Sequence, residues 1–215
     1  MSAAISQICI SDEEKEILQE IMNIAFGKAA ADLAEMINIF VELSVPSINM
    51  LPTTDLPGYI KSEMLGYNTI SIVEQNFWGK FKGSALLVFP AGAGKELITM
   101  FECDGESSFA TESMDILERE TLMEIGNILI GACVGKITEL LGDFVTYSPP
   151  KVVIENRSNE IIPKNLFNPE YSAIAMKTVF CFKDRDINGF LFLLTSHESF
   201  AWLKGSLVTF MEQYE

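Results

Sequence analysis

The amino-acid sequence predicts an α/β protein of the α+β kind, an internally duplicated, pseudo-twofold fold with a largely antiparallel sheet and two long helices. Three observations lead to this prediction. Two long stretches carry apolar residues at three- and four-residue steps, two pairs of extended segments are joined by short turns, and one helix motif recurs 104 residues later. Sequential strands with short connections pair antiparallel, which favours this type of sheet.

The composition is that of a chain that folds around a core and carries a large excess of acid. Of its 215 residues 48% are apolar, and the mean hydropathy is +0.23, which excludes a disordered chain. Thirty acidic residues against fifteen basic ones leave a net charge of −15. Because the phosphates of nucleic acids require lysine and arginine for neutralisation, we expect no nucleic-acid partner.

Cysteine usage and apolar runs indicate the compartment. The four cysteines have no metal-type spacing and form no Cys-x-x-Cys pair, which favours reduced thiols and no disulfide framework. The N-terminus lacks the pattern of a signal peptide, and the charge-free apolar runs are too short to cross a bilayer. We therefore expect a cytoplasmic protein with no membrane partner.

Signals for helices and strands follow one another in the same order in each half. The first helix is expected to start after Ser11, whose side chain fits a capping box with that of Glu14. The first half should then contain, in order, a helix over 12–36, strands over 39–45 and 48–51, a loop with one helical turn over 53–62, strands over 67–77 and 80–89, and a short helix over 95–101.

The second half repeats this order after a polar linker over 104–113. It should contain a helix over 113–141, strands over 143–147 and 151–155, a loop or helical turn over 157–167, strands over 171–183 and 188–195, and a helix over 196–213. Tyr67 and Tyr171 keep the 104-residue offset. We predict a single domain, residues 1–215, made of two repeats over about 11–103 and 113–215; two copies exclude a solenoid.

The repeated helix motif is a glutamate followed three residues later by an asparagine. A second glutamate precedes it by one turn, a glycine follows it by one turn, and a proline comes after twenty-two further residues. The two copies are Glu16, Glu20, Asn23, Gly27 and Pro46, and then Glu120, Glu124, Asn127, Gly131 and Pro150. On a helix the first four residues of each copy project within about 60° of one another.

Two interpretations of this motif are open. A carboxylate and a carboxamide one turn apart can hold a lysine or arginine together with a water, and a glycine lowers the helix surface so that another protein can approach. The same residues also fit a solvated helix face, with a glycine that packs against a neighbouring element. Glycine costs about 1 kcal/mol relative to alanine in a helix interior. Its recurrence at the same place in both copies favours the first interpretation.

Signs of other chemistry are weak. Residues 92–95, Gly-Ala-Gly-Lys, are similar to part of a phosphate-binding loop, but Glu96 follows the lysine where Ser or Thr is required, and Phe89 stands in place of the first glycine. No set of histidine, cysteine or carboxylate residues suggests metal ligation or nucleophilic catalysis. The one histidine, His197, lies at a predicted helix start, where a capping or surface role is expected.

The motif resembles the active-site pattern of the CheC/CheX/FliY family of chemotaxis phosphatases. That pattern is an acidic or serine residue, three residues, Glu, two residues, Asn, twenty-two residues, and Pro, and both copies here match it. The resemblance covers nearly the whole chain and implies a CheC-like fold. The length and the two copies look most like CheC itself, since CheX is shorter with one motif and FliY carries an extra C-terminal domain.

The resemblance implies dephosphorylation of a phosphorylated CheY-like response regulator. By that analogy Asn23 and Asn127 orient water for in-line attack on the aspartyl phosphate, and Glu20 and Glu124 grip a lysine of the regulator. It implies no cofactor of the chain's own, because positioning and electrostatics dominate phosphoryl transfer and the Mg²⁺ belongs to the regulator. It also implies a CheD-like deamidase as a further partner, for which no matching residues are evident.

One departure from the family pattern keeps other functions open. The family usually has Asp or Ser at the first motif position, whereas this chain has Glu16 and Glu120. The leading hypothesis is a phosphatase with two quasi-equivalent sites. The alternative is a non-catalytic binding module for a receiver domain or a CheD-like protein. A third is a structural scaffold whose helix faces bind no receiver.

Overall fold

A computed structural model describes residues 11–37, 40–52, 54–63, 69–101, 111–155, 172–183 and 187–212. Within them the chain forms five helices, α1 (Asp12–Ile37), α2 (Leu56–Glu63), α3 (Ala93–Phe101), α4 (Thr111–Leu140) and α5 (His197–Glu212). The strands are β1 (Val41–Leu43), β2 (Ser47–Pro52), β3 (Ile70–Trp78), β4 (Gly83–Pro90), β5 (Thr146–Tyr147), β6 (Lys151–Glu155), β7 (Ser172–Phe182) and β8 (Ile187–Ser196).

The strands form one sheet in the order β1-β7-β8-β4-β3-β5, with β2 also paired to β7 and β6 also paired to β3. Every pairing is antiparallel, as predicted. Exchange of the two halves, which replaces β1 by β5, β2 by β6, β3 by β7 and β4 by β8, reverses the strand order and leaves every pairing in place. The sheet therefore has a twofold connectivity; the internal duplication and the boundaries of its repeats stay predictions.

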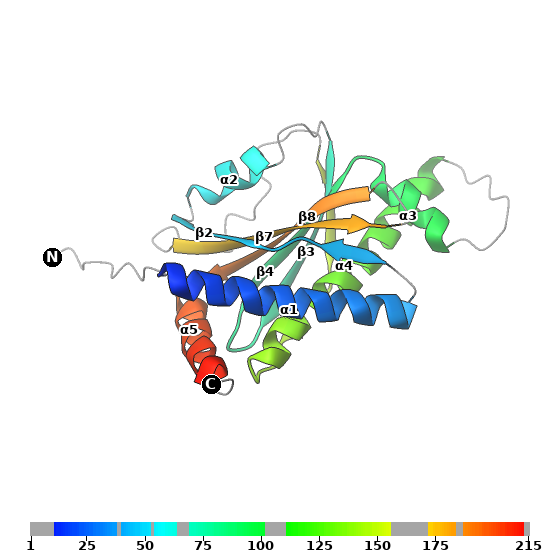
Figure 1. Cartoon of the computed structure of the whole chain (residues 1–215). Coiled ribbons are helices and arrows are strands. Elements are labelled where there is room, and N and C mark those ends of the chain that lie inside the picture. Colours follow the sequence, from blue (N-terminus) through cyan, green and yellow to red (C-terminus); the bar gives the residue numbers. More distant parts are fainter. Residues whose placement is uncertain are drawn as a thin grey trace.

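Helices cover both faces of this sheet, with the long ones on the same side. α1, α4 and α5 lie on one face and α2 on the other (Figure 1). Alternation along β4 serves both layers: Leu87 and Phe89 belong to the core under the long helices, and Leu86 and Val88 belong to the core under α2. The hydrophobic run in β4 is thus explained by burial on two faces.

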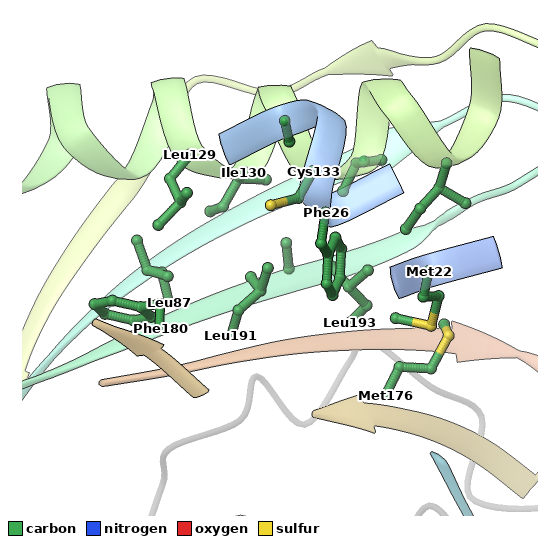
Figure 2. Close-up of a cluster of buried hydrophobic side chains, with 14 of the residues drawn as sticks. Met22, Phe26, Leu87, Leu129, Ile130, Cys133, Met176, Phe180, Leu191 and Leu193 are labelled. Carbon is green, nitrogen blue, oxygen red and sulfur yellow. The ribbon is translucent and has the colours of Figure 1, made fainter. Parts of the chain in front are cut away.

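The larger core lies between the long helices and the sheet. Figure 2 shows side chains of α1 and α4 directed towards the strands, among them Met22, Phe26 and Leu129. Each fully buried side chain of this size contributes about 1.5–3 kcal/mol relative to exposure. Cys133 is buried among them as a free thiol, and burial raises its pKa, so it acts as a small hydrophobe.

α1 and α4 also meet through charge. Lys136 Nζ of α4 lies 2.9 Å from Asp32 Oδ2 of α1 and 3.0 Å from Glu139 Oε2 of its own helix. By length and composition Ile116–Leu140 of α4 could cross a membrane, but half of its most apolar window is buried inside the protein. The packing of this helix against α1 and the sheet accounts for its apolar character.

The structure confirms the predicted start of α1. The backbone N–H of Ser11 donates to Glu14 Oε2 at 2.8 Å, and the N–H of Glu14 donates to Ser11 Oγ at 3.1 Å, which is the reciprocal pattern of a capping box. Glu14 Oε1 also lies 2.7 Å from Lys204 Nζ of α5. The cap therefore fixes the beginning of one helix to the side of another.

Three elements differ from the sequence predictions. The segment predicted as a loop with one helical turn is the eight-residue helix α2, because Pro57 falls in its first turn, where no N–H is needed, and Leu56 and Ile60 bury on the sheet. Strands β1 and β5 are shorter than the predicted 39–45 and 143–147. The predictions for 104–110 and 157–167 lie outside the described residues.

Serine side chains explain the shortness of β1 and β5. After β1, Ser44 Oγ accepts from the N–H of Val179 at 2.9 Å, and after β5, Ser148 Oγ accepts from the N–H of Asn76 at 3.0 Å. A side chain thus replaces the next backbone acceptor, and a proline with no N–H follows two residues later in each case. Strand pairing resumes only in β2 and β6.

The cap of α1 gives the first testable prediction. Ser11→Ala should lower the free energy of unfolding by about 1 kcal/mol. For Glu14, partial burial raises the pKa, but hydrogen bonds from Lys204 and Ser11 outweigh it and hold the pKa below 4.5. A lowered carboxylate pKa stabilises the fold above the unfolded-state pKa, and this stabilisation is lost as the pH falls through the folded-state pKa.

Glu14→Gln should therefore destabilise the protein near pH 7, with the difference from wild type shrinking below about pH 4.5. Urea unfolding across this pH range measures it, and exposed Glu13, in the same helical turn, provides the matched Glu13→Gln control. A Glu14→Gln deficit that does not change with pH would contradict the role assigned to the carboxylate.

Candidate functional site

The exposed faces of α1 and α4 carry the two motif copies. Glu16, Glu20, Asn23 and Gly27 are all exposed on α1, as are Glu120, Glu124 and Asn127 on α4, where Gly131 is partly buried. Between them, Ile21 and Ile125 are at most 2% exposed and face the core. Each motif therefore forms an open ridge of carboxylate and carboxamide groups above a fixed helix.

The first copy faces one edge of the sheet. A cavity of about 520 Å³ lies between α1 and the strands β1 and β7. Asn23 and Gly27 line it from the helix, and Leu43, Ser44 and Val179 line it from the strands and the residue that follows β1. Asn23 thus stands at the rim of a hollow formed by residues from both halves of the chain.

The second copy faces the opposite edge, at β3 and β5. Here the Nε2 group of Gln75, which is 1% exposed, donates to Asn127 Oδ1 at 2.8 Å and to the carbonyl of Ser148 at 3.0 Å. The Tyr147 hydroxyl donates to the carbonyl of Gly131 at 3.3 Å. Burial, with a smaller contribution from Cys133, raises the pKa of Tyr147 to about 12, so it remains a neutral donor.

The glycines of the motif are free of internal packing. A Cβ placed on Gly27 or on Gly131 would meet no atom within 4 Å. By contrast, a Cβ on Gly126 would lie 2.5 Å from Val73 Cγ1, so that glycine is required by the contact of α4 with β3. Gly27 and Gly131 therefore lack the structural reason that helix glycines often have, which favours their role in a surface that another molecule approaches.

The two prolines lie away from the exposed faces. Pro46 is buried, and its carbonyl accepts from Gln19 Nε2 of α1 at 2.8 Å. Pro150 is partly buried next to β6, whose Val152 carbonyl accepts from the guanidinium of Arg119 on α4 at 2.9 Å. These contacts attach α1 to Pro46 and α4 to β6, the strand that begins next to Pro150.

Several site residues were not singled out in the sequence. Ser44 and Ser148 keep the 104-residue offset and could have been found from it. Gln75 also left a signal, because it occupies a buried position in β3 where the alternation otherwise places Val73 and Phe77. Tyr147 left no such signal, because the residue 104 positions before it is Leu43.

Other chemistry is not supported in the part of the chain that the structure describes. No group of three histidine, cysteine or acidic residues there could hold a metal ion. The glycine-rich stretch forms the start of α3, where a Cβ on Gly94 would lie 2.3 Å from the Glu118 side chain. The buried Glu118 side chain thus occupies the space in front of this glycine.

The fold is shared with solved structures of flagellar and chemotaxis proteins. The structure superposes on FliY of Thermotoga maritima with a TM-score of 0.68 at 20% identity, covering 97% of this chain and all of that one. It also matches the CheX–CheY–BeF₃–Mg²⁺ complex of Borrelia burgdorferi with a TM-score of 0.50 at 18% identity, covering 81% and 97%. At these identities the likeness establishes the fold.

Sequence comparison finds relatives among chemotaxis and flagellar proteins. The CheC-like family model matches residues 13–50. The chain is 23% identical over 198 residues to the CheY-P phosphatase CheC of Bacillus subtilis, covering 89% of this chain and 92% of CheC. It is 24% identical over 158 residues to the flagellar motor switch phosphatase FliY of the same organism, covering 72% of this chain and 40% of FliY. These comparisons support the CheC/CheX/FliY family, whose members this chain is similar to.

The glycine contacts give the second prediction. Gly27→Ala and Gly131→Ala should each raise the free energy of unfolding by up to about 1 kcal/mol, because alanine is the better helix former and its methyl group meets open space. Gly126→Ala should lower it by about 1–2 kcal/mol, since its methyl group enters the space of buried Val73. Urea unfolding of the three single variants tests the contrast; equal effects would refute it.

Proposed function

We propose that this chain hydrolyses the aspartyl phosphate of a CheY-like response regulator, with one site on each motif helix. The observation that carries the proposal is the pair of exposed Glu-x-x-Asn ridges, each followed by a glycine that no internal contact requires. The relatives support it, because CheC is named a CheY-P phosphatase, FliY a flagellar motor switch phosphatase, and CheX a protein crystallised with CheY.

The chemistry needs little from this chain beyond position. A water oxygen attacks the phosphorus in line with the bond to the aspartyl oxygen, that bond breaks, and the aspartate leaves as a carboxylate with inorganic phosphate as the other product. A carboxamide can donate and accept hydrogen bonds at once, so Asn23 or Asn127 can hold the attacking water in that line. Positioning of this kind supplies a large part of the barrier reduction in phosphoryl transfer.

The glutamates supply the grip on the partner. Glu20 and Glu124 lie one turn before their asparagines and are exposed, so each carboxylate is free to pair with a lysine of the receiver. The regulator brings its own Mg²⁺ and phosphate, and the chain needs no cofactor of its own. A ridge, unlike a pocket, can enter the concave active site of another protein, and Gly27 and Gly131 lower the helix surface beside it.

Two further elements belong to this proposal. A response regulator as substrate places the chain in the cytoplasm. A CheD-like deamidase is proposed as a second partner on the family resemblance alone. The binding-module hypothesis shares the same surface and differs only in the absence of hydrolysis, so the test below separates them.

The decisive experiment is the double variant Asn23→Ala and Asn127→Ala. Phosphate loss from a phosphorylated CheY-type receiver in Mg²⁺ should be faster with the wild-type chain, and the double variant should abolish that acceleration. The double variant should still fold, with a loss of about 1–3 kcal/mol in the free energy of unfolding, because Asn127→Ala removes the acceptor of the buried Gln75 amide. Activity within a few-fold of wild type in the double variant would sink the proposal.

A wild-type chain that binds the phosphorylated receiver without changing its rate of phosphate loss would instead establish the binding module. Absence of binding to every receiver tested would favour a scaffold. Each outcome needs the same two measurements, a binding titration and a rate of phosphate release.

The position of the two sites predicts the stoichiometry. Because Asn23 lies by β1 and β7 and Asn127 by β3, at opposite edges of the sheet, two receivers should bind one chain at once. Calorimetric titration with a beryllofluoride-activated receiver should give two equivalents per chain. Glu20→Lys should reduce this to one. Glu35→Lys, at an exposed position near the end of the same helix, is the matched control. A single equivalent with wild type would contradict the prediction.

A further inference from the structure

The two motif asparagines have different surroundings. The side chain of Asn127 accepts a hydrogen bond from Gln75 Nε2 at 2.8 Å. Asn23 has no hydrogen-bond partner among the residues that the structure describes, and its side chain borders the cavity of about 520 Å³ beside β1 and β7. The carboxamide of Asn127 is therefore held by a hydrogen bond, whereas that of Asn23, in the other copy of the motif, is not held by any described residue.

The difference originates in the strands rather than in the helices. In β3, Phe77 pairs with Tyr147 of the short strand β5; in β7, Phe180 pairs with Leu43 of the short strand β1. Gln75 and Thr178 each lie two residues before the paired phenylalanine, so they occupy equivalent positions. Both are 1% exposed. Both also bond the carbonyl of the serine after the short strand, Gln75 Nε2 to Ser148 at 3.0 Å and Thr178 Oγ1 to Ser44 at 2.6 Å.

Side-chain length decides what else each residue can reach. The Thr178 hydroxyl ends close to its own backbone and bonds Ser44. Gln75 is longer, and its amide nitrogen carries two hydrogens, one for the Ser148 carbonyl and one for Asn127. Both hydrogens of the Gln75 amide nitrogen are thereby used. The bond to the Ser148 carbonyl, just after β5, fixes the position of this amide.

The bond also sets the orientation of Asn127. Since Oδ1 accepts from Gln75, the carboxamide plane is held, and its NH₂ group and the second lone pair of Oδ1 remain for a partner. An unheld Asn23 must lose its rotamer freedom in the transition state, where it has to align the attacking water. A pre-organised group avoids this loss and starts closer to the reactive geometry.

From this geometry we infer that Gln75 is a positioning residue for Asn127, which makes the second site the faster of two unequal sites. The inference rests on the proposed function for its kinetic consequence. Its structural part, one ordered and one unordered asparagine amide, stands without catalysis and can be measured separately.

Side-chain amide NMR tests the structural part on the wild-type chain. The NH₂ signals of Asn23 and Asn127 are assigned by their disappearance in the single Asn→Ala variants. ¹⁵N relaxation should then show Asn127 as ordered as the backbone and Asn23 as mobile on the nanosecond timescale. Equal order for the two amides would overturn the inference, whether or not the protein hydrolyses any phosphate and whether or not a Gln75 variant folds.

Kinetics of single-site chains test the consequence. The Asn23→Ala chain, which retains only the second site, should show a kcat about tenfold higher than the Asn127→Ala chain, with a similar KM. In the Asn23→Ala background, Gln75→Met keeps the length of the side chain but removes its donors, and should lower kcat by about tenfold with little change in KM. A kcat that stays the same or rises would overturn the positioning role.

A double-mutant cycle separates positioning from general damage. The kcat loss caused by Gln75→Met should disappear when Asn127 is already alanine, because the substitution then has no asparagine to release. Loss of the same size in both backgrounds would show that Gln75 acts through the fold alone and would refute the inference. If neither single-site chain accelerates phosphate loss, the proposed function fails while the NMR comparison still decides the geometry.

Discussion

Neither half of this chain completes its own part of the sheet, and the rest of the structure depends on this constraint. The short strand after α1 pairs with the long strand β7 of the other half, and the short strand after α4 pairs with β3. The central contact, β4 with β8, joins the halves again. Because each motif helix packs over a strand from the opposite half, both candidate sites are composite, and the chain must be whole for either to exist.

The fold was largely accessible from the sequence because its signals are strong and local. Ser11 and Glu14 mark the first helix start, and long apolar runs mark the central strands, which the structure confirms. The motif faces also came out exposed, as the helical spacing required. The misjudged elements depend on tertiary contacts: α2 is helical because Leu56 and Ile60 find a sheet surface to bury on, which no local pattern reveals.

The site was accessible only in part, for a related reason. Spacing identifies residues that share a helix face, so Asn23 and Asn127 emerged together. Gln75 is brought to Asn127 by the pairing of β5 with β3, a contact across about seventy residues that sequence periodicity cannot encode. The difference between the two sites follows from one position in the strands, which is Gln75 in β3 and Thr178 in β7. The helix motif is the same in both copies and does not reveal this difference.

The composite construction also bears on how the protein forms. Val41 pairs with Phe182, so the edge beside Asn23 closes only when residues far apart in the chain meet. Such long-range pairings carry a large loop-closure entropy and make folding slow. During synthesis α1 emerges early with its motif residues, but the strand β7 that lies beside it in the folded protein is made much later. A receiver that recognises this surface would therefore bind only chains whose sheet has formed completely.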